Sequence, residues 1–66
     1  MKIKYDKEAD ILIFILKDDP PVDAIEEPGG VIFSYNDKKD PVSIEILNAS
    51  CRLHLQPGEL NVILQG

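Results

Sequence analysis

Only one cysteine, Cys51, and one histidine, His54, occur among the 66 residues of the sequence. A single cysteine cannot form an internal disulfide, which fits a protein of the reducing cytoplasm. One cysteine and one histidine without a CxxC pair are too few for a structural zinc site. We expect one domain over residues 1-66, with no metal and no cofactor. A domain this short buries only about 60% of its unfolded surface, so association remains the open source of additional stability.

Long apolar runs are missing as well. The longest run, Ile11–Leu16 (ILIFIL), has six residues and falls far short of the roughly 20 that span a bilayer. The basic start, Met1–Asp6, is not followed by the apolar core and small-residue cleavage site of a signal peptide. We therefore expect a cytoplasmic protein that does not contact membranes.

Basic side chains are in the minority, because seven lysines and arginines face twelve acidic residues and give a net charge of −5. A negative field repels phosphate groups, so direct binding of nucleic acid is disfavoured. The same field would favour a basic protein partner and speed the encounter with it. The simpler interpretation is that acidity keeps a small protein soluble.

No ten-residue window carries an apolar stripe at helical spacing, whereas short alternating or branched segments recur between turn residues. Pro28-Gly29-Gly30 predicts a turn, because proline fixes φ and glycine accepts positive φ. The expected fold class is mainly β, a small antiparallel meander of five to seven strands. The strands are expected over residues 2–5, 11–16, 31–35 and 42–47, with a short edge strand over 22–27.

The C-terminal pattern has two interpretations. Apolar and polar residues alternate from Cys51, and the alternation resumes after Pro57-Gly58, which favours a terminal hairpin. Alternatively, Asn48 and Ser50 could cap a short helical turn after the fifth strand. Between these two interpretations the alternation favours the hairpin.

The segment ILIFIL is apolar at six consecutive positions, although a half-buried strand normally alternates. Both of its faces must therefore leave water. One face is expected in the core of the domain. The other must be covered by a second copy of the chain, by a partner, or by the C-terminal residues folded back.

Three blocks, MKIKYDKEADILIFIL, EEPGGVIFSYND and VSIEILNAS, follow each other in an order that resembles the family called domain of unknown function 2283. The resemblance covers Met1 to about Ser50. The sequence departs from the family pattern at Asn36 and Asn48, where aspartate is usual, and at Ser43, where glycine is usual, and it lacks the turn glycine expected over 38–40. The resemblance implies a small cytoplasmic β protein without an assigned reaction. Some such proteins accompany genes for small toxin-like proteins, which makes an antitoxin role a candidate.

The same resemblance helps to orient ILIFIL. The recurrent apolar positions of the family fall on Leu12, Phe14 and Leu16, which implies that these side chains point to the core. Intervening positions then form a second apolar face. The interface predicted on that face consists of Ile11, Ile13, Ile15, Ile32 and Leu47.

Two groups of residues carry side chains that are capable of chemistry. Asp6, Glu8 and Asp10 could hold a divalent cation or share a proton, but a solvated turn whose aspartates bind backbone N–H groups is favoured. Cys51 and His54 would lie on opposite faces of a strand and side by side on a helix. We expect Cys51 to be a small apolar filler and His54 to be exposed, so neither group is predicted to be catalytic.

Residues 18–27 contain five acids and no base. Such a run is usually a solvated face, but it can also dock a cationic partner. We predict a non-enzymatic protein-interaction module, with a basic, toxin-like protein as the candidate partner. The alternative is a self-associating homodimeric structural domain, and an enzyme ranks last. The candidate acidic docking patch consists of Asp18, Asp19, Asp23, Glu26 and Glu27.

Overall fold

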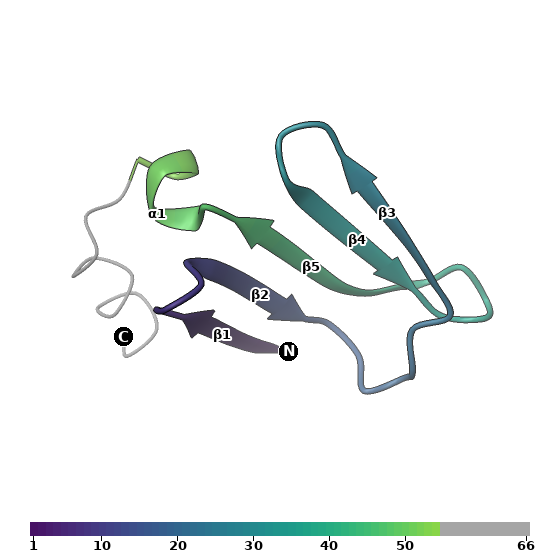
Figure 1. Ribbon diagram of the computed structural model, residues 1–66. Coiled ribbons are helices and arrows are strands. Elements are labelled where there is room, and N and C mark those ends of the chain that lie inside the picture. Colours follow the sequence, from purple (N-terminus) through teal and green to yellow (C-terminus); the bar gives the residue numbers. More distant parts are fainter. Residues whose placement is uncertain (55–66) are drawn as a thin grey trace.

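The computed structural model describes residues 1–54 as one five-stranded antiparallel sheet followed by a short helix (Figure 1). This confirms the mainly β fold class and the helical turn considered after the fifth strand. No helix within residues 1–54 is long and apolar enough to cross a membrane. The elements are β1 Lys2–Asp6, β2 Ile11–Ile15, β3 Asp23–Glu27, β4 Val31–Tyr35, β5 Pro41–Leu47 and α1 Ala49–Arg52.

The strand order is β1-β2-β5-β4-β3, which differs from a plain meander at one connection. After β2, residues 16–22 lead the chain to the far edge of the sheet, where β3 begins. From there β4 and β5 lie successively closer to β2, and β5 pairs with β2. Pro20 and Pro21 lie in this connection and cannot donate to a strand ladder. Residues 22–27, expected as a short edge strand, contain β3, which forms the edge of the sheet opposite to β1.

The turn predicted at Pro28-Gly29-Gly30 connects β3 to β4. Gly29 and Gly30 have φ values of 100° and 87°, which glycine adopts at little cost. A Cβ on Gly29 would also lie 2.8 Å from a guanidinium nitrogen of Arg52. Positive φ and close approach together explain why glycine is suited to this turn.

The prediction of a strand from Cys51 is wrong for residues 51–54. Residues Ala49–Arg52 form α1, and the chain then turns through His54, which has a φ of 56°. Asn48 precedes the helix in a left-handed conformation, and its side chain makes no capping hydrogen bond. Cys51 is exposed and unpaired rather than an apolar filler, whereas His54 is exposed as expected. The remainder of the predicted hairpin, 55–66, lies outside the described residues.

Asp10 fixes α1 to the sheet. Its carboxylate accepts hydrogen bonds from the Tyr5 hydroxyl at 2.6 Å, the Ser50 hydroxyl at 2.8 Å and the Ser50 backbone N–H at 3.1 Å. Its backbone carbonyl accepts a fourth bond, from the N–H of Ala49 at 3.0 Å. One residue in the β1–β2 turn thus connects β1 with a helix 40 positions further along the chain.

These contacts predict how stability depends on pH. Hydrogen bonds from Tyr5 and Ser50 lower the pKa of Asp10 below its usual 3.8, and the bond to Asp10 raises the pKa of Tyr5 above 10.0. The contribution of Asp10 to folding stability is therefore present above pH 3.8 and is lost as the pH falls through the folded-state pKa of Asp10. The contribution of Tyr5 to stability is present below pH 10 and is lost as the pH rises through the folded-state pKa of Tyr5. In urea titrations, the stability difference between wild type and Tyr5→Phe should be constant between about pH 5 and 9 and shrink on both sides. A difference that stays the same at pH 2 and at pH 11 would contradict this assignment.

The hydrophobic core of residues 1–54 is small and lies at one corner of the sheet. Its buried apolar side chains are Leu12 and Ala49, with 5% and 0% of their surface exposed; Val42, which is 2% exposed, is buried separately near the start of β5. Ala49 of α1 packs on Leu12, and Tyr5 and Phe14 pack beside them. Of the side chains expected in the core, Leu12 is buried, whereas Phe14 and Leu16 are only half-buried. Away from α1, residues 1–54 contribute no further helix and no second sheet to either side of this one.

Candidate interaction surface

The strand register places the five residues of the predicted interface on one side of the sheet. Ile11 pairs with Leu47, while Ile13 pairs with Glu45, which in turn pairs with Ile32. Paired residues of neighbouring strands point to the same side, and Ile15 follows by alternation. All five side chains are half-buried. We call this side the isoleucine face: Ile11, Ile13, Ile15, Ile32, Leu47 and the central Glu45.

Glu45 is the residue of this face that the sequence did not single out. It lies in the middle of the central strand β5, with Ile13 on one side and Ile32 on the other. No lysine or arginine of residues 1–54 forms an ion pair with it. The sequence signal was its alternation with Ile44 and Ile46, which places it on the same side as Leu47. Its apolar neighbours, however, depend on the pairing of three strands.

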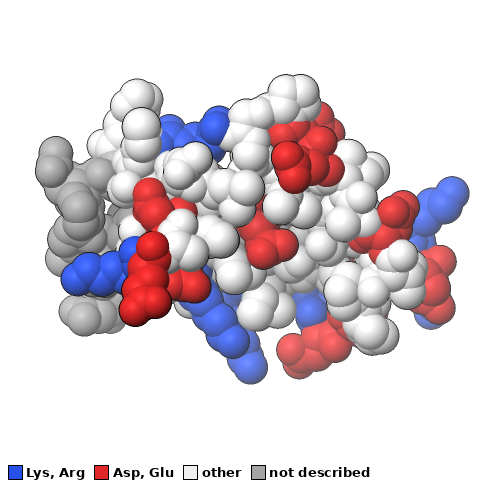
Figure 2. Space-filling view, viewed as in Figure 1, with Lys and Arg blue, Asp and Glu red and all other residues white. Residues whose placement is uncertain are grey.

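Charged side chains lie mainly around the margin of the sheet in Figure 2, and an acidic side chain lies near the middle of the view among uncharged ones. On the isoleucine face, the register places Lys2, Lys4 and Asp6 on edge strand β1 and Glu26 on edge strand β3. Glu45 is therefore the charge at the centre of this face, and the other charges flank it. A ligand for this face needs an apolar surface with a cationic group near its middle.

The opposite side of the sheet carries an uninterrupted apolar row. Ile3, Phe14, Ile44, Phe33 and Ile25 are paired in succession across β1, β2, β5, β4 and β3. We call this side the aromatic face. Its end members at the two edges remain 39% exposed at Ile3 and 47% exposed at Ile25. The three central members, Phe14, Ile44 and Phe33, are half-buried, and Phe14 also packs beside Leu12 under α1.

The predicted acidic patch is spread along one edge of the sheet. Asp18 and Asp19 lie in the connection before β3, and the other three acids lie on β3; all five are exposed. Alternation divides the acids of β3, because Asp23 and Glu27 belong to the aromatic face and Glu26 to the isoleucine face. The run is therefore an acidic edge strand that borders both faces.

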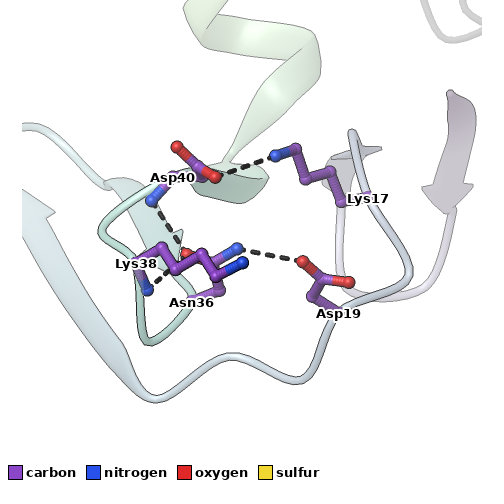
Figure 3. Close-up of polar contacts among 5 residues, drawn as sticks. All are labelled: Lys17, Asp19, Asn36, Lys38 and Asp40. Carbon is purple, nitrogen blue, oxygen red and sulfur yellow. Dashed lines mark hydrogen bonds and ion pairs between the residues drawn. The ribbon is translucent and has the colours of Figure 1, made fainter.

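Asn36 organises the turn between β4 and β5 (Figure 3). Its side chain is 5% exposed, and its amide nitrogen donates to Asp19 at 2.9 Å. Its amide oxygen accepts from the backbone N–H groups of Lys38 and Asp40, each at 2.9 Å. Nearby, the Lys17 ammonium lies 3.0 Å from Asp40 and lowers the pKa of that carboxyl. These contacts tie the connection after β2 to the β4–β5 turn and have a structural role.

The residues considered for chemistry form no catalytic arrangement in the described part of the chain. Asp6 accepts a bond from the backbone N–H of Ala9, and Asp10 binds Ser50, as expected for aspartates of a turn. No group of three or more potential metal ligands is found among residues 1–54. Cys51 and His54 are both exposed, and the contact between them joins the backbone N–H of His54 to the carbonyl of Cys51.

Comparison with known protein families places the chain in a family. The model of a family described as "Protein of unknown function (DUF2283)" matches residues 2–50, which is most of the chain. This confirms the resemblance carried by the three sequence blocks. No curated protein and no solved structure matches the chain.

Proposed function

The chain belongs to the DUF2283 family, and we propose that it is a non-enzymatic protein-interaction module that binds a small basic protein through its isoleucine face. The observation that supports this is the position of Glu45 among Ile13, Ile32 and their apolar neighbours. A carboxylate with apolar side chains on both neighbouring strands is costly to bury without a cation once water is displaced, whereas a lysine or arginine from a partner would pair with it. Apolar contact would supply affinity and the charge would select a basic partner.

The acidic edge would guide this partner to the face. Asp18 and the three acids of β3 are exposed and border the isoleucine face. Exposed charges of one sign accelerate association with a partner of the opposite sign, and salt screens the effect. The association rate should therefore fall as the salt concentration rises, while the dissociation rate changes little.

The partner we propose is a basic toxin whose substrate site the sheet covers, which would make the chain an antitoxin. The experiment is co-expression with the product of the adjacent gene, with growth and complex formation as the readouts. Growth should recover and a complex should co-purify. If growth does not recover and no complex with that product forms, the antitoxin role is overturned.

A variant pair tests the isoleucine face directly. Glu45→Lys should weaken the complex at least tenfold, because two cations would then meet at the centre of the face. Asp37→Lys makes the same change of charge at an exposed position of the β4–β5 turn and should leave affinity within about twofold. Titration calorimetry measures both affinities, and circular dichroism verifies that both variants are folded. Equal affinity of Glu45→Lys and wild type would refute the role of this face.

A further inference from the structure

We propose that a second copy of the chain packs on the aromatic face, so that two sheets form a face-to-face sandwich. The row Ile3, Phe14, Ile44, Phe33 and Ile25 crosses all five strands and contains no charged or polar side chain. Both ends of the row are substantially exposed. Apolar sheet faces are ordinarily buried against a second layer about 10 Å away. Within residues 1–54 that layer is limited to α1 at one corner.

The order of side chains in this row suits a copy of itself. Read across the sheet it is Ile, Phe, Ile, Phe, Ile, and it is the same in both directions about Ile44 on the central strand. A two-fold axis along β5 would place Ile3 opposite Ile25 of the second copy and Phe14 opposite Phe33 of the second copy. Two-fold interfaces require a self-complementary patch of this kind.

Charge distinguishes the two faces as sites for a copy. A second copy on the isoleucine face would bring Glu45 close to its own equivalent at the centre of the contact, and like charges there are unfavourable. On the aromatic face the charged positions, Asp23 and Glu27, lie at the two ends of edge strand β3. The copy therefore belongs on the aromatic face. This assignment does not depend on the proposed function, since it leaves both isoleucine faces outward.

The size of the face also fits a copy. At the usual strand spacing the row is about 19 Å wide, and a second sheet has the same width.

The first test is the solution mass of the full chain, measured by analytical ultracentrifugation over a dilution series. Wild type should have twice the mass of the chain. Ile25→Lys places a charge at the rim of the aromatic face and should raise the dimer dissociation constant at least tenfold. Ala24→Lys, its neighbour on the other face of the same exposed strand, should leave the constant within about twofold. A monomer at all concentrations, or equal effects of the two lysines, would overturn the proposal.

A second test works without weakening the fold. In a Cys51→Ser background, Ile44→Cys and Ile13→Cys place one thiol on the aromatic face and one on the isoleucine face. A short bismaleimide should link Ile44→Cys chains into covalent dimers and leave Ile13→Cys chains unlinked. The reverse pattern would place the second copy on the isoleucine face. A monomer whose Ile44→Cys thiol does not react with the reagent would mean that the chain's own residues cover the aromatic face. Either result overturns the proposal of a dimer through the aromatic face. The effect of Glu45→Lys on partner binding tests the proposed function separately.

Discussion

Leu12→Ala is expected to lower the free energy of unfolding by about 2–5 kcal/mol. Leu12 is 5% exposed and lies between Ala49 of α1 and the half-buried Phe14 and Tyr5. Its truncation leaves a cavity at the one corner where helix and sheet are packed, and it removes the apolar support of α1. A domain of 66 residues has roughly 3–10 kcal/mol of stability in total. The expected loss is therefore a large fraction of the total stability.

Urea titration monitored by circular dichroism measures this loss. The matched control is Val22→Ala, which also shortens an aliphatic side chain but at a position that is 63% exposed. It should change the free energy of unfolding by less than about 0.5 kcal/mol. Similar losses in the two variants would mean that the corner at Leu12 is not the core of the domain.

Local sequence signals were sufficient to predict the strands. Alternation and branched side chains marked four of them, residues 22–27 were expected as a short edge strand, and Pro28-Gly29-Gly30 marked the turn between β3 and β4 with its two positive φ angles. The division of Ile11–Leu16 into two faces was also predictable, because alternation alone separates Leu12 and Phe14 from Ile11 and Ile13. Each of these features depends on residues that are close together in the sequence.

The features that the sequence did not predict depend on distant residues. Helix α1 forms where alternation from Cys51 favoured a strand, because Ala49 is buried on Leu12 and Ser50 binds Asp10, 40 positions away. The pairing of β2 with β5 likewise joins segments about 30 residues apart, and only this pairing places Glu45 beside Ile13. The candidate site is therefore half predictable: its apolar residues follow from local alternation, and its central charge follows from strand order.

Asn36→Asp is expected to lower the free energy of unfolding by about 1–3 kcal/mol, although aspartate differs from asparagine by a single group. The asparagine oxygen accepts bonds from the N–H groups of Lys38 and Asp40, and an aspartate oxygen can continue to accept them. The amide nitrogen, however, donates to the carboxylate of Asp19. Aspartate would replace this donor with an acceptor, so that two carboxylates would meet at a buried position.

A double-mutant cycle separates this contact from other effects of the substitution. Asp19→Asn in the Asn36→Asp background restores one amide and one carboxylate with their positions exchanged, and it should recover most of the lost stability. Asp19→Asn should not recover the stability lost in Asn36→Ala, because alanine has no oxygen to accept hydrogen bonds from the two backbone N–H groups. Thermal unfolding at pH 7 measures wild type, the three single variants and the two double variants. If Asp19→Asn gives no recovery with Asn36→Asp, the stability of the connection after β2 depends on other contacts, with the ion pair of Lys17 and Asp40 the first to test.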